Sequence, residues 1–231
     1  MTEAELRESF VSVMRGWLGY SEANGRYKAI IDLYNTQRPL PRGYAVQYDD
    51  EWCATTVTAA GIKAGLQDII YGECSCSRMI ELYQRAGRWM EDDAYRPDIG
   101  DIIMYHWDDT GHGDDTGAPN HVGVVSYING NTITVIEGNK GQAVSTRTTS
   151  VNGRYIRGYC LPDFASMADK EDTDDMKIYH WFADMPDWAR PSAEKAYKKG
   201  IIKADSGSGA VNVYEVNLQT IVWLDRLGLL D

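Results

Sequence analysis

The sequence has little positive charge and no long apolar run. Asp and Glu outnumber Lys and Arg by 34 to 23 in the 231 residues, which gives a formal net charge of −11. Nucleic-acid-binding surfaces need a basic stripe to meet the phosphates, and anionic membrane surfaces attract basic segments, so the charge argues against both partners. No apolar run approaches the roughly 18 residues of a membrane span, which argues against membrane insertion.

The first twenty residues lack the pattern of a secretory signal peptide. They carry acidic residues early, in "MTEAELRESF", and no basic start is followed by an apolar block. We therefore expect a protein that is made in the cytoplasm and is not exported by the standard secretory route.

Cysteine is also scarce. The four cysteines, Cys53, Cys74, Cys76 and Cys160, are too few in a chain of this length for a disulfide framework. Cys74 and Cys76 are too close in sequence for an easy bridge, and no second ligand pair accompanies them for zinc. We predict that these two are buried small residues at the start of a helix.

Helical patterns fill the first ninety residues. Apolar residues recur at helical spacing in four segments, and the third begins at Cys53 and has Gly65 placed to end it. After "RPDIGD" the period changes to two, in short β-rich runs separated by Gly, Asn and Asp. Helices followed by strands predict a segregated α+β domain. The predicted helices cover 2–19, 21–37, 53–64 and 77–89, and the predicted strands cover 101–107, 121–128, 132–138 and 153–160.

The chain divides into two predicted domains and a linker. The α+β pattern ends near Pro162, and we assign residues 1–163 to the first domain. Residues 164–177 are polar, acidic and without periodicity, as linkers are. Residues 178–231 hold two helical patterns joined by the Gly/Ser-rich turn in "KADSGSGAVNVY". They predict a small helical module, whose core would be marginal alone.

Cys53 could be a nucleophile or a small buried hydrophobe. A cysteine needs a base, most often histidine, to be a useful nucleophile near neutral pH. His121 opens a predicted strand, and the next strand ends with Glu137 and Asn139, which could hold the second imidazole nitrogen. The start of a helix adds free N–H groups and the positive end of the helix dipole, both of which favour a thiolate.

The hairpin between these two strands makes the assignment testable. With a three-residue loop at 129–131, or an equivalent bulge, His121 lies across from Asn139 and shares a face with Glu137. With a two-residue loop at 129–130 and no bulge, Glu137 points away from His121. We predict the odd loop or a bulge. Taken singly, Cys53, His121, Glu137 and Asn139 could each have a packing or turn role. Their order along the chain, at a helix start and at two strand ends, is what predicts a site.

Four stretches, in this order, resemble a CHAP domain (cysteine- and histidine-dependent amidohydrolase/peptidase). They are "WCATTVTAAGIKAG", "CSCSRMIELYQRAGRW", "RPDIGDIIMYHW" and "NHVGVVSYINGNTITVIEGN". The resemblance covers roughly residues 1–163 and is greatest to the CHAP domains of bacteriophage and clostridial cell-wall lysins. It implies a papain-like α+β fold and no required cofactor. The implied site residues are Cys53 as nucleophile, His121 as general base, and Glu137 and Asn139 as polar orienting residues.

The resemblance implies hydrolysis of an amide bond in bacterial peptidoglycan by a phage endolysin. Such an enzyme is made in the host cytoplasm and acts on the wall after release. N-acetylmuramoyl-L-alanine amidase and peptide-bridge endopeptidase both stay open, because they cut amides with the same machinery. Two rivals of other kinds are a thiol amidase or protease with a non-wall substrate and a non-catalytic wall-binding protein on the same fold. Gln47, six residues before Cys53, is the candidate for an oxyanion-hole side chain.

Some CHAP domains bind calcium near the nucleophile, so the resemblance makes calcium the metal to consider. The candidate ligands are Asp49 and Asp50 in "YDDEW" and Asp108 and Asp109 in the loop "WDDTGHGDDTGAPN". Their spacing is not that of an EF-hand loop, and a solvated acidic loop is the alternative.

The C-terminal stretch "FADMPDWARPSAEKAYKKGII" resembles a single S-layer homology repeat. The resemblance implies binding to the cell wall, although the Thr-Arg-Ala-Glu stretch of such repeats has no counterpart in "YEVNLQT". The alternative is a module that packs on the catalytic domain or mediates self-association.

Overall fold

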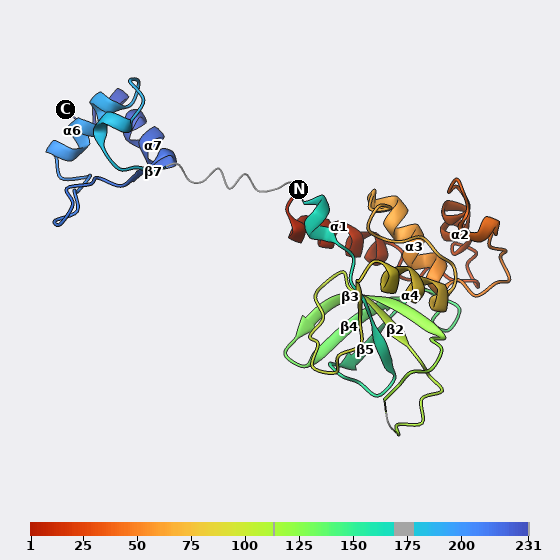
Figure 1. The fold of residues 1–231 in the computed structure, drawn as a ribbon. Coiled ribbons are helices and arrows are strands. Elements are labelled where there is room, and N and C mark those ends of the chain that lie inside the picture. Colours follow the sequence, from red (N-terminus) through yellow and green to blue (C-terminus); the bar gives the residue numbers. More distant parts are fainter. Residues whose placement is uncertain (113, 169–177, 231) are drawn as a thin grey trace. The chain divides into compact units, whose positions relative to one another are not determined.

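The computed structural model describes residues 1–112, 114–168 and 178–230. The chain forms two compact units, Met1–Asp169 and Lys170–Asp231, each with a hydrophobic core of its own. Figure 1 traces both units along the chain.

Helices come first in the N-terminal unit. In Figure 1 they gather together beside the strands instead of alternating with them. The first helix starts with a capping box between Thr2 and Glu5 and buries one apolar face. The second predicted helix, 21–37, is mostly irregular and keeps only its last part. The elements are α1 (Glu3–Gly16), α2 (Lys28–Tyr34), the 3-10 turn η1 (Pro41–Gly43), α3 (Cys53–Ala64) and α4 (Cys76–Arg85).

Helix α3 lies in the middle of this unit. Its residues from Cys53 to Gly61 are all buried, and most of them are small, so that neighbouring elements can pack closely on every side. Gly65 follows in the left-handed conformation, with φ of 73°, and ends the helix as predicted.

A six-stranded antiparallel sheet follows the helices, which confirms the predicted α+β order. The strand order is β1-β6-β2-β3-β4-β5. Side chains alternate between a core shared with the helices and a second apolar cluster on the other face. Two strands, β1 and β5, were absent from the sequence prediction. The strands are β1 (Trp89–Met90), β2 (Ile102–Tyr105), β3 (His121–Asn129), β4 (Thr132–Glu137), β5 (Ser145–Ser150) and β6 (Ile156–Cys160).

The hairpin between β3 and β4 combines a two-residue turn with a bulge. The turn covers residues 130–131, not the three residues predicted at 129–131. A register shift follows between Val125 and Tyr127, which makes Ser126 the extra residue of a β-bulge. Turn and bulge together give the pairing that the three-residue loop would have given.

Beyond the bulge, this register decides which side chains share a face. Val124 pairs with Ile136. Continued to the strand ends, the same register places His121 opposite Asn139, with Glu137 diagonal to His121 on one face. The prediction that an odd loop or a bulge brings His121 and Glu137 to the same face is confirmed.

The N-terminal unit extends further than the predicted domain end at residue 163. Residues Phe164–Met167 form the short helix α5, and the Phe164 side chain is fully buried against Phe10 of α1. The predicted linker, 164–177, therefore begins too early, because an aromatic side chain draws its first residues into the core. The remainder of that prediction, 169–177, lies outside the described residues.

The C-terminal unit combines two helices with a small ribbon that the helical prediction did not include. An apolar cluster that includes Ala193, Ala196, Leu218 and Ile221 packs the helices together. Among the described residues of either unit, no helix is both long and apolar enough to cross a bilayer. The elements are β7 (Ile178–Tyr179), the 3-10 turn η2 (Phe182–Asp184), α6 (Arg190–Lys198), β8 (Val213–Tyr214) and α7 (Glu215–Arg226).

Candidate active site

Cys53 is the first residue of α3, where the helix offers unpaired N–H groups. The N-cap residue Trp52 makes no side-chain cap, so the N–H groups of the first turn remain free for other acceptors. The N–H of Ala54 donates to Cys53 Sγ. The Cys53 side chain is almost covered, with 7% of the residue exposed. This position favours the thiolate over the thiol.

Helix α3 is held against the end of β4 by a close contact at a glycine. Gly138 directly follows β4 and lies against Thr56, one helical turn beyond Cys53. A Cβ atom at position 138 would be 2.0 Å from Thr56 Oγ1, which only glycine avoids. This contact brings the start of α3 to the strand ends that carry His121 and Glu137.

His121 is the first residue of β3 and lies between Cys53 and Glu137. Its Nε2 atom is 3.1 Å from Glu137 Oε2, and the ring also hydrogen-bonds the Cys53 sulfur. Because Nε2 faces the carboxylate, Nδ1 is the nitrogen that remains for Cys53. Contacts at both ring nitrogens therefore fix the orientation of the imidazole, as the sequence predicted for a catalytic base.

Glu137 is the last residue of β4 and is completely buried. The neighbouring strand makes room for it with Gly123, where a Cβ atom would be 2.7 Å from Glu137 Cγ. One carboxylate oxygen faces His121, and the other accepts a hydrogen bond of 2.6 Å from Arg147 Nε. A buried carboxylate needs such partners to stay ionised.

Arg147, on β5, is a member of the site that the sequence analysis missed. Its guanidinium pairs with Glu137 and also lies over the Trp107 ring, 4.5 Å from the centroid. Trp107 in turn stands 6.1 Å from the His121 ring, centroid to centroid. The signal that could have revealed its strand is the run "STRTTS", because threonine is enriched in β-strands.

The two predicted orienting residues are placed differently. Glu137 contacts His121, whereas the Asn139 amide is turned away and donates to Glu51 Oε2, in the segment before Cys53. Asn139 has a positive φ of 56°, which suits asparagine better than most residues. The predicted contact between Asn139 and His121 is not formed, and Asn139 instead ties the loop before α3 to the end of β4.

The charges of the site follow from these contacts. A hydrogen bond with the neighbouring thiol of Cys76 lowers the pKa of Cys53, whereas burial raises it. The hydrogen bond with His121 lowers it further, and the resulting pKa lies well below the usual value. Burial lowers the pKa of His121, but hydrogen bonds to Cys53 and Glu137 outweigh burial and raise it from 6.5 to about 9. Burial raises the pKa of Glu137, but His121 and Arg147 together bring it below the usual value. At neutral pH the pair is therefore a thiolate and an imidazolium.

Cys76, the first residue of α4, borders Cys53. Its Sγ atom is 3.8 Å from Cys53 Sγ. The hydrogen bond to Cys53 and burial raise the pKa of Cys76 well above the usual value, so Cys76 stays a thiol that donates to the Cys53 thiolate. The prediction of a buried small residue at a helix start is confirmed for Cys76, although it did not include this contact. The same prediction is wrong for Cys74, which is half-buried and lies two residues before the helix.

The residues before Cys53 hold their own loop together. Asp50 Oδ2 accepts from the Tyr44 hydroxyl and the Gln47 N–H, both at 2.7 Å. The Gln47 side chain donates to the Ala45 carbonyl, so Gln47, the oxyanion-hole candidate, is turned into its own loop. Asp49 is exposed.

The second pair of calcium candidates is also engaged in loop contacts. Asp108 accepts from Asn120, and Asp109 accepts from the Gly111 N–H and lies 3.6 Å from the Arg154 guanidinium. Within the described residues, Asp49, Asp50, Asp108 and Asp109 do not form a group of three or more that could hold a metal ion. Calcium binding stays a prediction from the resemblance.

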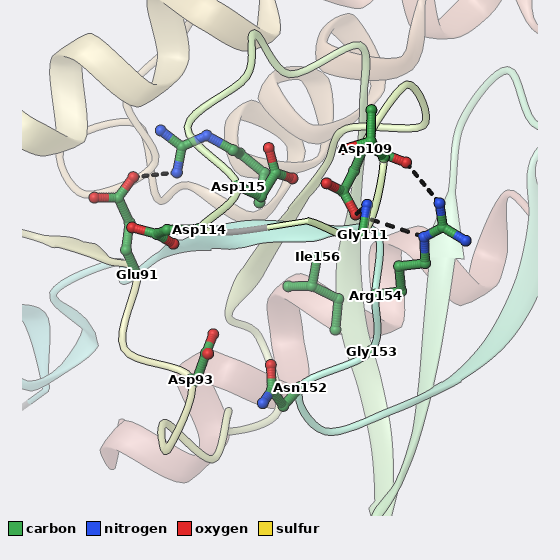
Figure 2. A pocket seen from close by; sticks show the side chains of 12 residues that line it. Glu91, Asp93, Asp109, Gly111, Asp114, Asp115, Asn152, Gly153, Arg154 and Ile156 are labelled. Atoms are coloured by element: carbon green, nitrogen blue, oxygen red, sulfur yellow. Dashed lines mark hydrogen bonds and ion pairs between the residues drawn. The ribbon is translucent and has the colours of Figure 1, made fainter.

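A cavity of about 410 Å³, lined by both acidic and basic side chains, lies beside this loop. Figure 2 shows the side chains of Glu91, Asp93 and Asp109 apart from one another instead of converging on one point. Arginines neutralise two of them, because Arg157 pairs with Glu91 and Arg154 with Asp109. The cavity therefore has mixed charge.

The chain Arg147–Glu137–His121–Cys53 can perform nucleophilic catalysis. A thiolate at a helix start can attack a carbonyl carbon, and the N–H groups of the first turn can stabilise the resulting oxyanion. The imidazolium can then give its proton to a leaving group. Cys53, His121 and Glu137 were all predicted as site residues, and the structure brings them together.

Comparisons with known proteins point to the same part of the chain. Residues 43–139 match the family model of the CHAP domain. This segment contains Cys53, His121 and Glu137, and CHAP domains are typically cysteine- and histidine-dependent amidohydrolases or peptidases. The match supports a CHAP-domain protein and an enzyme of this type.

The chain was also compared with curated proteins and with solved structures. No curated protein matches the chain. The crystal structure of Ly7917 is similar at 16% sequence identity with a TM-score of 0.34, over 68% of this chain and 62% of that chain. The present chain thus matches less than two thirds of the length of Ly7917.

Proposed function

We propose that this protein is a peptidoglycan hydrolase that cleaves an amide bond of the bacterial cell wall through Cys53. The observation that carries the proposal is the contact chain from Cys53 through His121 to Glu137, inside the segment that matches the CHAP domain. This arrangement supplies a nucleophile, an acid–base group and an orienting carboxylate, which are the three parts that thiol hydrolysis of an amide needs.

The chemistry starts from the thiolate–imidazolium pair. Cys53 Sγ attacks the amide carbonyl carbon, and the N–H of Cys53 itself is positioned to stabilise the oxyanion. His121 protonates the amine, which leaves as the carbon–nitrogen bond breaks. A water molecule then gives a proton to His121 and attacks the thioester, which releases the new carboxylate and restores the pair. Glu137 keeps its charge throughout and stabilises the imidazolium.

The bond and the biological role are finer parts of the proposal. Both the amidase bond, between glycan and stem peptide, and the endopeptidase bond, within the peptide bridges, fit the same chemistry. The role as a phage endolysin, made in the host cytoplasm and acting on the wall after release, rests on the resemblance of the sequence motifs. No step of the chemistry requires a cofactor.

The C-terminal unit is proposed to bind the wall, with self-association as the alternative. The resemblance to an S-layer homology repeat supports wall binding. Exposed tryptophans also support it, because aromatic rings with a polar edge suit sugar and peptide surfaces. Trp181, Trp188 and Trp223 are 50%, 49% and 66% exposed.

Clearing of a suspension of purified cell walls tests the function. We expect the wild-type protein to clear the suspension and Cys53→Ala to lose at least about 10³-fold in rate. Cys74→Ser is the matched control and should clear at the wild-type rate. The Cys74 sulfur accepts a hydrogen bond from Arg42 and lies outside the contact chain. Failure of the wild-type protein to clear any wall would favour a different amide substrate. Equal clearing by Cys53→Ala would contradict the thiol mechanism.

A further inference from the structure

In the proposed reaction Cys53 forms and breaks bonds, whereas its sulfur neighbour, Cys76, only donates a hydrogen bond to it. The two Sγ atoms are 3.8 Å apart, and all four cysteines of the chain are free thiols. Both residues are nearly buried, with 7% of Cys53 and 8% of Cys76 exposed. A second thiol in contact with a nucleophilic thiolate is the arrangement of a reactive and a resolving cysteine.

The geometry allows a bond between the two sulfurs. A disulfide bond is about 2.05 Å long, so the sulfurs have to approach by less than about 2 Å. Each cysteine is the first residue of a helix, α3 or α4, and each side chain has a rotatable Cα–Cβ bond. The present contact means that no segment of chain has to move out of the way.

The other two thiols have different surroundings. Cys74 is half-buried, and its sulfur accepts a hydrogen bond of 3.1 Å from Arg42 Nη2. Cys160 lies on β6 and is completely buried. Among the four cysteines, the contact between two sulfurs is that of Cys53 with Cys76.

We propose that Cys53 and Cys76 form a reversible disulfide when a peroxide oxidises Cys53, which makes this pair an oxidative modification site. Its effect on activity rests on the proposed function, since the disulfide would occupy the nucleophile. The formation of the disulfide does not rest on it, because it needs only the two sulfurs and the oxidant.

The chemistry proceeds in two balanced steps. The Cys53 thiolate attacks one peroxide oxygen of hydrogen peroxide, so that a sulfur–oxygen bond forms and the oxygen–oxygen bond breaks. The released hydroxide leaves as water with a proton from His121. Cys76 then loses its proton and attacks the Cys53 sulfenic acid, so that the sulfur–sulfur bond forms and the sulfur–oxygen bond breaks. The departing hydroxide takes that proton as a second water, and the two electrons lost by the thiols are gained by the peroxide.

The disulfide protects the nucleophile from permanent damage. A sulfenic acid without a resolving thiol is oxidised further to a sulfinic acid, which thiol reductants do not reverse. With Cys76 in contact, the sulfenic acid is consumed first. A thiol reductant then restores both cysteines and the activity.

Intact-mass and peptide-mass measurements on the full chain test this inference. After treatment with hydrogen peroxide, we expect the wild-type protein to lose about 2 Da, with a cross-link between Cys53 and Cys76 in its peptides. Dithiothreitol should reverse the change and restore wall clearing. Cys74→Ser is the matched control and should form the same cross-link.

The variant Cys76→Ser removes the resolving thiol. With peroxide it should gain about 32 Da on Cys53 as a sulfinic acid, and dithiothreitol should not restore its activity. Sulfinic acid at Cys53 of the wild-type protein without a disulfide would overturn the inference, as would a cross-link from Cys53 to Cys74. Peptide mapping of the wild-type protein decides the matter even if Cys76→Ser does not fold. The masses also report on the disulfide if the protein clears no wall, so the two proposals fail separately.

Discussion

At the scale of single residues, the site is a chain of alternating charges. Arg147 keeps Glu137 ionised in a buried position, Glu137 stabilises a protonated His121, and His121 stabilises the Cys53 thiolate. Each link compensates for the cost of burying the next charge. The Cys53 thiolate, which we propose as the nucleophile, is therefore formed without help from a substrate.

The alternating charges from Arg147 to Cys53 predict a bell-shaped dependence of kcat/KM on pH. On the acidic side the rate rises as Cys53 loses its proton, with a midpoint well below the usual pKa of a thiol. On the alkaline side the rate falls as His121 loses the proton that the leaving amine needs, with a midpoint of about 9. Initial rates on a soluble wall fragment between acidic and alkaline pH measure both limbs. An alkaline limb near the ordinary histidine pKa would contradict the ion pair.

Glu137→Gln tests the carboxylate that holds His121. Loss of the negative charge lowers the pKa of His121, so the imidazolium is lost at a lower pH and the alkaline limb of the rate profile moves toward neutral pH. We expect kcat/KM near neutral pH to fall by about 10²-fold, as for the loss of an acid–base contribution.

A conservative change elsewhere provides the control. Glu81→Gln alters a surface carboxylate that pairs with Arg78 and should leave both the rate and the profile unchanged. An unchanged alkaline limb in Glu137→Gln would show that Glu137 does not set the charge of His121.

At the scale of helices and strands, the sequence predicted most of the site. Cys53, His121 and Glu137 were identifiable because they stand at a helix start and at two strand ends, where period and turn signals change. Arg147 was missed because its strand is an edge strand without apolar alternation. Cys76 was predicted only to pack at a helix start. Its contact with Cys53 was missed because nothing in the local sequence pattern shows it.

The hairpin shows why register is harder to predict than strands. Both turn lengths were compatible with "NGN", and only the bulge at Ser126 decides that His121 and Glu137 share a face. The bulge depends on tertiary contacts, because the Ser126 carbonyl accepts from Arg15 and its hydroxyl donates to the Thr134 carbonyl. A carbonyl that pairs with a residue 111 positions away in sequence leaves no local pattern.

Gly138→Val tests the contact that places α3 against β4. The added side chain meets Thr56 at a distance that no Cβ atom can keep, so the helix start has to move away from the strand ends. We expect a loss of about 1–3 kcal/mol in the free energy of unfolding, measured by urea denaturation, together with a loss of activity.

Gly16→Ala is the control for this glycine. A Cβ atom at Gly16 has nothing within 4 Å, so the variant should keep the stability and the activity of the wild-type protein. Wild-type stability and activity in Gly138→Val would contradict the role of this contact in placing Cys53.

At the scale of the whole molecule, the two features to explain are the fold class of each unit and the net charge. Helices followed by strands were enough to predict the α+β class, whereas the ribbon β7–β8 is too short to stand out in the sequence. The papain-like detail of the fold stays a prediction from the resemblance. The net charge of −11 would oppose approach to a wall that carries anionic polymers, so the wall binding that we propose would rest on sugar and peptide contacts.

The charge predicts an unusual response to salt. We expect the clearing of anionic walls to become faster, by roughly a few fold, as NaCl rises from about 20 mM to about 150 mM, because salt screens the repulsion. Hydrolysis of a short, uncharged wall peptide should not change over this range. A steep fall in wall clearing with salt would instead indicate attraction between the protein and the wall by charge.

The most direct test of the central claim is mass spectrometry of the products from defined peptidoglycan digested in H₂¹⁸O. The account predicts that each cut yields a new free amine and a new carboxylate that carries one ¹⁸O atom, and that Cys53→Ala yields neither. Free amines on bridge residues identify an endopeptidase, and separation of intact glycan from stem peptides identifies an amidase. Cuts in the glycan strands, or the same amide products from Cys53→Ala, would contradict the account.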